Sequence, residues 1–193
     1  MASHDGSGGH ELRRLVMLGP PASGKGTQGK RLAAQLGIPH VSTGALLRRT
    51  IDDGDPLGVA GLIADGKRVS DEIVEQVLEP ALGDAFLLDG YPRTAEQAAR
   101  LDELLAGRAL DRAVELVADK EILVCRMMLR ADAEQRTDDS PEVFLRRLND
   151  YLHEEPAIRG HYAGRITSID SSGAPNEVYA RMLEALGLAP VRV

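Results

Sequence analysis

The stretch GPPASGKGTQ, residues 19–28, decides the fold of this chain. Gly19, Gly24 and Lys25 have the spacing of a phosphate-binding loop, whose backbone N–H groups and following helix N-terminus converge on one anion. Residues 13–19 form a strand-like run before the loop, and a helical pattern follows it. A buried strand, this loop and a helix in that order make the match specific. The sequence therefore predicts a phosphate cradle at the end of a strand.

Two side chains of this loop carry the chemistry of phosphate binding. Lys25 is placed to reach the β- and γ-phosphates of a nucleotide as a point charge. The Thr27 hydroxyl is placed to meet a phosphate oxygen or a water bound to magnesium. A glycine-rich turn without a ligand is the alternative, and the agreement of spacing and context argues against it. Gly26 is an additional glycine between the lysine and the threonine.

The composition of the 193 residues is that of a soluble globular protein with one principal domain, since 43% are hydrophobic and 27% are charged. The formal net charge of −7 argues against a nucleic-acid partner, because binding a phosphate backbone needs an excess of Lys and Arg. Cys125 is the only cysteine, which excludes an internal disulfide and a cysteine-rich zinc cluster and fits a reducing cytoplasm. Residues 1–10 lack the pattern of a signal peptide and are predicted to be a disordered leader, and no membrane span is predicted.

Short apolar runs alternate with helical stretches along the chain, as in a parallel sheet with helices on its faces. The run 85–90 is almost entirely apolar, which indicates a strand buried on both faces. Ser140 and Pro141 suit the start of a helix at 141–154. The predicted fold class is α/β, with a five-stranded parallel sheet between helices. The strands are predicted at residues 13–19, 38–42, 85–90, 113–118 and 165–170.

A second polar cluster lies in FLLDGYPRT, residues 86–94. Asp89 ends a buried strand, at the edge of an open α/β sheet where ligands bind. An acid there can hold the water shell of a magnesium ion, and Arg93, fixed by the turn at Gly90 and Pro92, can direct several donors at a phosphate. An acid-containing turn with a solvated arginine is the alternative reading. The nearby phosphate loop favours the ligand site.

Five stretches match one family in that family's order. They are GPPASGKGTQ (19–28), VSTGALLR (41–48), DGKRVSDEIV (65–74), FLLDGYPRTAEQ (86–97) and RTDDSPEVFLRRL (136–148). From about residue 15 to near its end, the chain resembles the adenylate kinases, within the nucleoside monophosphate kinases. The resemblance implies a P-loop NTPase-like fold and transfer of the γ-phosphoryl group of MgATP to AMP, giving two ADP. Gly26 is typical of this family.

The resemblance also implies how the chain is organised. It predicts a single domain at 11–193, with a mobile acceptor-binding insertion at about 42–71 and a short lid at about 127–139. Long-lid members carry an insertion in the lid, sometimes with cysteine-bound zinc, and this chain has neither, so that no zinc is expected. The expected cofactor is Mg²⁺, and the expected partners are ATP, AMP and ADP. We expect a cytoplasmic monomer that binds neither nucleic acid nor a membrane.

On the donor side, the resemblance implies that the phosphate loop and two arginines of one helix face bind ATP, with Arg126 stacked on the adenine. The donor set is Gly19, Pro20, Pro21, Ala22, Ser23, Gly24, Lys25, Gly26, Thr27, Gln28, Arg126 and Arg130. Phosphoryl transfer needs positive charge around the equatorial oxygens, and the catalytic residues implied are basic. They are Lys25, Arg93, Arg130, Arg136 and Arg147. For any one of these arginines, a solvated helix face is the ordinary alternative.

On the acceptor side, the resemblance implies that Thr43 and Arg48 hold the phosphate of AMP and that residues 67–69 cover its base and ribose. Gln97 would read the adenine, since its amide offers both a donor and an acceptor. A solvated helix position is the ordinary alternative for Gln97. The acceptor set is Thr43, Gly44, Arg48, Lys67, Arg68, Val69, Gly90, Arg93, Gln97, Arg136 and Arg147.

Two positions depart from the family pattern. Ala22 stands where glycine is usual, so that a positive φ there would be strained. Ala45 stands where an acid is usual, which leaves Asp89 for the magnesium shell, with Thr27 as a further candidate. A UMP/CMP kinase is the nearer alternative, although that branch usually has asparagine where this chain has Thr94. A catalytically idle nucleotide-sensing module is the other, and the retained charged residues argue against it.

Overall fold

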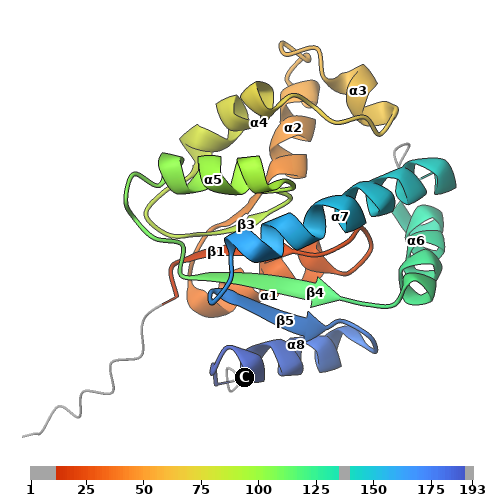
Figure 1. Cartoon of the computed structure of the whole chain (residues 1–193). Coiled ribbons are helices and arrows are strands. Elements are labelled where there is room, and N and C mark those ends of the chain that lie inside the picture. The colour runs from red at the N-terminus through yellow and green to blue at the C-terminus, as the bar shows by residue number, and fades with distance from the viewer. Residues whose placement is uncertain (1–11, 135–139, 190–193) are drawn as a thin grey trace, which may run out of the picture.

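The computed structural model describes residues 12–134 and 140–189, and for residues 130–134 the backbone alone. Within them, five parallel strands form one sheet in the order β2-β3-β1-β4-β5 (Figure 1). The strands are β1 Arg14–Leu18, β2 His40–Ser42, β3 Phe86–Asp89, β4 Arg112–Val117 and β5 Ile166–Asp170. The registers place Asp89 opposite both Met17 and Ser42, so that three strands end side by side. The predicted five-stranded parallel sheet is confirmed.

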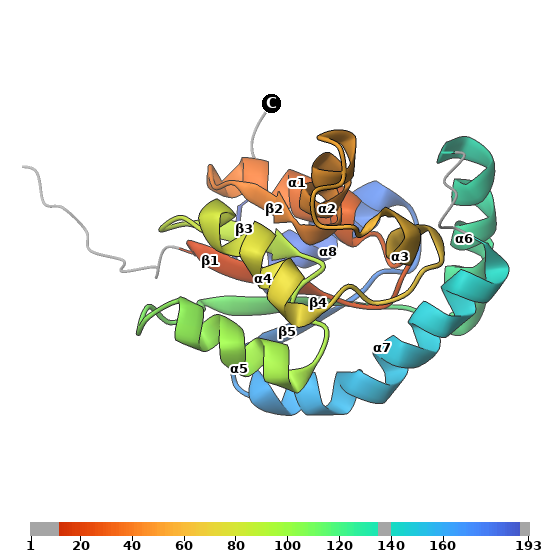
Figure 2. The ribbon, with the colours of Figure 1, turned by 90° about the horizontal axis from the view of Figure 1, so that it is seen from above.

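Helices cover both faces of this sheet (Figures 1 and 2). The helices packed on it are α1 Lys25–Leu36, α5 Ala95–Leu104, α7 Pro141–His161 and α8 Pro175–Ala185. Val16 points to the core beneath α5 and α7, whereas Leu15 and Met17 point to the core beneath α1 and α8. This alternation follows from the two-residue repeat of a strand and explains why β1 is apolar on both faces.

The predicted acceptor insertion, residues 42–71, is called the flap below. Its helices are α2 Thr43–Asp52 and α3 Ala60–Ala64, and α4 Asp71–Leu78 with the 3-10 helix η1 Glu79–Ala81 leads back to the sheet. Ser42 caps α2 by accepting from the Ala45 N–H at 3.4 Å. Helix α3 buries no residue. The flap is therefore less deeply packed than the helices on the sheet.

Two predicted boundaries are wrong. Strand β2 begins at His40 rather than at residue 38, because the Ile38 N–H donates to the Ala33 carbonyl in the turn that ends α1. Helix α7 continues past residue 154 to His161, although Pro156 within it has no N–H to donate. Two residues after the proline are buried, Ile158 at 3% exposed and Tyr162 at 0%, and Figure 2 shows α7 following a curved path. This burial outweighs the lost hydrogen bond.

Helix α6 Lys120–Glu134 completes the described elements. The predicted leader, 1–10, and most of the predicted lid loop lie outside the described residues. Across the part of the chain that is described, no helix has both the length and the apolar character needed to cross a bilayer.

Candidate active site

A cleft of about 1820 Å³ opens at the carboxyl ends of the strands. Its walls come from the phosphate loop, the flap, the turn after β3, and helices α6 and α7. Ligands bind at this edge in open α/β sheets, because helix N-termini and loops converge there. The cleft is large enough for more than one small ligand.

The phosphate loop connects β1 to α1 and is pressed against the sheet. Gly19 has φ +137°, and a Cβ there would stand 2.6 Å from the Leu116 carbonyl oxygen, so that only glycine fits. Gly24 precedes α1 in the left-handed region, with φ 95°. Ala22 also adopts a left-handed φ of 62°, and its methyl packs against a small apolar cluster at the base of α6 and α7. The strain foreseen at this alanine is present.

Lys25 lies across the mouth of the loop. Its Nζ donates to the carbonyl oxygens of Gly19 and Pro20, at 2.7 Å in each case. The ammonium group is therefore held against the first residues of the phosphate loop, where it faces the cleft.

Three residues of the predicted donor set do not line the cleft: Pro20, Ser23 and Gln28. Ser23 and Gln28 are buried, and the Gln28 amide donates to the Pro175 carbonyl at 2.9 Å, which ties α1 to α8. The other loop residues line the cleft, namely Gly19, Pro21, Ala22, Gly24, Lys25, Gly26 and Thr27.

Asp89 faces the start of α1 across an open space. A Cβ on Gly26 would stand 3.6 Å from Asp89 Oδ2, so that the glycine leaves the approach to the carboxylate clear. The exposed Thr27 lies on the same turn. A carboxylate and a hydroxyl oxygen facing a phosphate loop are ligands that Mg²⁺ prefers. These residues therefore fit the metal that the sequence predicted.

His40 stands beside Asp89 and lines the cleft, although it was not among the predicted site residues. Its Nε2 lies 3.8 Å from Asp89 Oδ2, and among the described residues this buried atom has no hydrogen-bond partner. Burial lowers the pKa of His40, and the attraction of Asp89 opposes that shift. Among the described residues, no three His, Cys, Asp or Glu side chains gather as a metal cluster.

Gly90 brings the acceptor side close to β3. Thr43 Oγ1 donates to the Asp89 carbonyl at 3.3 Å. Gly90 has φ +93°, and a Cβ there would stand 2.5 Å from Thr43 Oγ1, so that the glycine permits this approach. Gly44 leaves similar room for Arg48, since a Cβ on it would stand 3.4 Å from Arg48 Nη1.

Arg93 marks the place where guanidinium groups converge. Its Nε donates to the Gly90 carbonyl at 2.8 Å, which holds the side chain against the turn after β3. The side chain faces the cleft, and the crowding of protein around it lowers the pKa of Arg93, as does repulsion from Arg147 and Arg68. An arginine keeps its charge through such a shift. Like charges drawn together at one wall of a cleft indicate an anion site.

The flap reaches α7 across one end of the cleft. Arg68 lies 3.6 Å from Asp150 and 3.7 Å from Glu154, both on α7. Arg146 Nη2 donates to the Asp65 carbonyl at 3.1 Å. Lys67 pairs with Asp65 at 2.8 Å within the flap itself. The strip 67–69 lines the cleft, with Lys67 and Arg68 exposed and Val69 half-buried.

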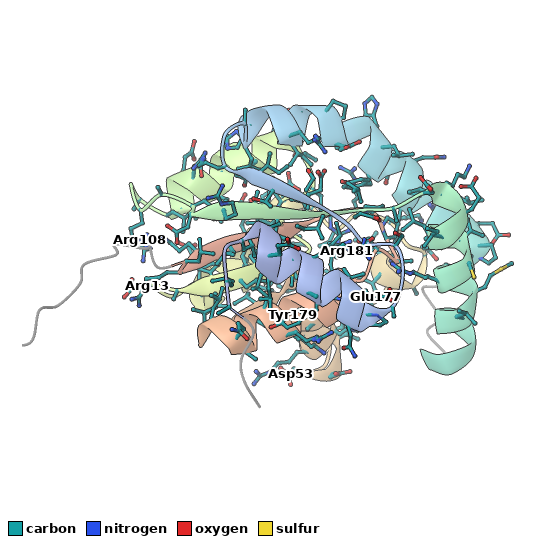
Figure 3. All side chains as sticks on the ribbon, turned by 90° about the horizontal axis from the view of Figure 1, so that it is seen from below. Arg13, Asp53, Arg108, Glu177, Tyr179 and Arg181 are labelled. Atoms are coloured by element: carbon teal, nitrogen blue, oxygen red, sulfur yellow. The ribbon has the colours of Figure 1, made fainter. Side chains whose placement is uncertain are left out.

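Arg126 lies on α6 and is anchored by the loop after β5. Its Nη2 donates to the Ser171 carbonyl at 2.6 Å and to the Gly173 carbonyl at 3.1 Å. Two side chains of helix α8, labelled in Figure 3, support that loop. Glu177 accepts from the Ala174 N–H at 2.9 Å, and Arg181 pairs with Asp170 at 2.8 Å.

The remaining predicted residues divide into two groups. Thr43, Gly44, Arg48, Lys67, Arg68, Val69, Gly90, Arg93, Gln97, Arg126 and Arg147 all line the cleft. The Arg130 side chain and the whole of Arg136 lie outside the described residues.

Sequence reasoning missed a buried carboxylate at the floor of the cleft. Glu115 is 1% exposed and accepts hydrogen bonds from Tyr151 at 3.2 Å and from Ser168 at 2.6 Å, and it pairs with Arg159. Its partners are 36, 53 and 44 residues away in the chain. No local pattern could have joined them.

The fold and the site together define a P-loop protein of the phosphoryl-transferring class, with a phosphate cradle facing a second, arginine-rich anion site. A family model described as adenylate kinase matches residues 17–166. The chain is 46% identical over 185 residues to an adenylate kinase of Xanthomonas campestris pv. campestris (strain B100), covering 90% of this chain and 99% of that one. It is 42% identical over 183 residues to an adenylate kinase of Corynebacterium glutamicum (strain R), with the same coverage.

The chain belongs to the adenylate kinase family. It is an enzyme, an ATP:AMP phosphotransferase, and its substrates are nucleotides. The UMP/CMP kinase alternative is not favoured. Enzymes of this family generally act on MgATP.

Proposed function

We propose that the cleft binds MgATP in the phosphate loop and AMP against the arginine-rich wall, and aligns them for direct transfer of the γ-phosphoryl group. The observation that carries this assignment is the placement of Asp89 between two anion sites: Lys25 and its loop on one side, and Arg93 with Arg147 on the other. No protein nucleophile is needed, because an oxygen of the AMP phosphate attacks the γ-phosphorus and ADP leaves.

On the donor side, the backbone N–H groups of residues 19–27 and the N-terminus of α1 bind the phosphates of ATP. The Lys25 ammonium exchanges its two carbonyl contacts for phosphate oxygens. Arg126, anchored by the carbonyls of Ser171 and Gly173, presents the face of its guanidinium to the adenine. The loop after β5 thus positions the donor base.

On the acceptor side, Thr43, Arg48 and Arg93 hold the phosphate of AMP, and Gln97 reads the base. Residues 67–69 cover the base and ribose, with Val69 as the apolar contact. Arg147, near Arg93, neutralises charge on the group in transit, and Arg130 and Arg136 are proposed to join it from the lid. Fixed donors at the developing charge lower the barrier without reorganisation.

Magnesium, when bound with ATP, neutralises charge on the β- and γ-phosphates. Asp89 would hold it through water, and Thr27 offers a further oxygen. Ala45 lines the cleft but has no oxygen in its side chain, so that this shell has one carboxylate where the family pattern has two.

Flap and lid are proposed to close over the bound nucleotides, because a phosphoryl group exposed to water would be hydrolysed. We propose that the chain is a single domain with a mobile flap at 42–71 and a short lid at 127–139. We further propose that it is a cytoplasmic monomer that needs no zinc and binds neither nucleic acid nor a membrane.

A coupled assay of the purified protein with MgATP and AMP, UMP, CMP or GMP tests the assignment. We expect rapid ADP formation with AMP and much slower reaction with the other three. Faster turnover with UMP or CMP than with AMP would overturn the acceptor assignment. Tight nucleotide binding with no turnover for any acceptor would instead favour the idle sensing module.

A further inference from the structure

The proposed mechanism gives no role to Asp71, the first residue of α4. Asp71 Oδ1 accepts a hydrogen bond from Gln97 Nε2 at 2.6 Å, although the two residues are 26 positions apart. Asp71 is exposed and Gln97 is 7% exposed. A carboxylate on the flap side of the cleft therefore reaches the one amide that is proposed to read the acceptor base.

The other end of the same amide is also held. Gln97 Oε1 accepts from the Arg93 backbone N–H at 2.7 Å. The Gln97 backbone N–H donates to Thr94 Oγ1 at 3.1 Å, which fixes the first turn of α5. The Gln97 side chain is thus held at its base and at both atoms of its amide.

These two partners determine which way the amide points. A backbone N–H can only donate, and an ionised carboxylate can only accept, so that Oε1 must face Arg93 and Nε2 must face Asp71. A flipped amide would set its NH₂ group against the Arg93 N–H and its oxygen against the Asp71 carboxylate. Both contacts, which are partly buried, would then be repulsive.

One N–H on Nε2 and one lone pair on Oε1 of Gln97 are left for a ligand. Gln97 lines the cleft, beside the apolar Val69 and Val74. A 6-aminopurine offers a donor at N6 and an acceptor at N1, which an amide in a fixed orientation can match. A 6-oxopurine offers an acceptor at O6 and a donor at N1, which reverses the pattern and requires the flipped amide.

We propose that Asp71 is a positioning residue that sets acceptor specificity: it locks the Gln97 amide so that the site accepts 6-aminopurine monophosphates and rejects 6-oxopurine monophosphates. This inference rests on the proposed function, because it takes the acceptor base to lie against Gln97. Sites whose buried polar groups match one hydrogen-bonding pattern reject the unmatched ligand strongly, because the groups are left unpaired.

The test compares AMP with inosine monophosphate, its 6-oxo counterpart, as acceptors for the full-length protein. The variant is Asp71→Asn, which keeps the size of the side chain but can present either an oxygen or an NH₂ group to Gln97. Glu72→Gln is the matched control, since it makes the same change of charge one residue along on the exposed first turn of α4.

We expect the ratio of kcat/KM for AMP to that for inosine monophosphate to be at least about 100 in the original protein. In Asp71→Asn the ratio falls by about fivefold or more, because the contact at residue 71 then allows either orientation of the amide and only the Arg93 N–H still opposes the turn that matches the 6-oxo edge. In Glu72→Gln it stays within about twofold. General damage to the site would lower both rates together and leave the ratio unchanged.

A fall of less than about fivefold in Asp71→Asn, or an equal fall in Glu72→Gln, would overturn the inference. Failure of the proposed function is a separate outcome, visible as the absence of AMP phosphorylation by the unmodified protein. Asp71→Ala provides a second variant: without any acceptor at this position, the ratio must fall as well.

Discussion

The phosphate loop and the flap line opposite sides of one cleft and are both proposed to bind phosphate-bearing ligands, yet they are built differently. The loop is pressed onto the sheet: Ser23 and Gln28 are buried, and Gly19 leaves no room for a side chain. The flap buries no residue of α3, but Leu47 and Val59 are buried, and it meets α7 both through exposed charges such as Arg68 and through Gly66, where a Cβ would clash with Val143. The donor loop is therefore held by close packing on the sheet, whereas the flap combines apolar packing with ion pairs that can exchange with water.

This difference suits a transfer between two nucleotides. A packed loop keeps Lys25 and the backbone donors in place before ATP arrives, so that little reorganisation is needed at the reacting phosphate. The surface ion pairs between the flap and α7 add little to the cost of the proposed opening for AMP, because such pairs contribute about 0–1 kcal/mol each. The comparison predicts larger effects from changes in the loop than from changes in the flap.

The largest effect is expected for Lys25→Ala. Loss of one fixed charge contact to the transition state typically lowers turnover by about 10²–10³-fold. The fold should remain intact, because the two carbonyls that the Nζ contacts belong to its own loop. Steady-state rates and thermal melting check this, with Lys120→Ala at the exposed start of α6 as the control. Near-normal turnover with an unchanged melting temperature would remove Lys25 from the mechanism.

Two glycine substitutions compare the packing of the two regions directly. Gly19→Ala combines a forbidden φ with a contact of 2.6 Å to a backbone oxygen, and should lower the free energy of unfolding by about 3 kcal/mol. Gly58→Ala in the flap has φ +65° with nothing within 4 Å, and should lower it by only about 1 kcal/mol. Urea unfolding of both variants measures the difference. Equal losses would contradict the contrast between a packed loop and a loosely packed flap.

A smaller effect is expected at Ala45, the flap position proposed to lie beside the metal. Ala45→Asp restores a carboxylate on the first turn of α2 and should lower the magnesium concentration for half-maximal rate by about twofold or more. ATP binding measured without metal should change little, and the affinity for AMP should weaken slightly through repulsion of its phosphate. Ala45→Asn, which adds an oxygen without charge, is the control. Superimposable magnesium titrations of the original and Asp proteins would place Ala45 away from the metal shell.

The smallest effect on stability is expected for Arg68→Ala. Its pairs with Asp150 and Glu154 are exposed, so that the free energy of unfolding should fall by less than about 1 kcal/mol. The KM for AMP should rise while the KM for ATP stays nearly constant, because Arg68 lines only the acceptor side in the proposed assignment. A loss of stability comparable to that of Gly19→Ala would show that the flap is held as firmly as the loop.

The sequence by itself determined the features that are encoded in contiguous residues. The phosphate loop and the order of strands and helices depend on neighbours in the chain, as do the caps at Ser42 and Ser140. The apolar character of β1 on both faces follows from its own residues. The predicted lining of the cleft also followed from short motifs, since those motifs lie where strands end at one edge of the sheet. Arg93 was identified in this way, whereas Thr43 was implied by the resemblance to the adenylate kinases.

Only the tertiary structure decided which distant groups meet. Asp71 with Gln97, Arg126 with the Ser171 and Gly173 carbonyls, and Glu115 with Arg159 are partners separated by 26 to 47 residues, and local propensity carries no information on such pairs. The continuation of α7 beyond Pro156 has the same origin, because burial of Ile158 and Tyr162 compensates the missing hydrogen bond. Packing energy is shared across the whole core, so that these outcomes depend on all elements together.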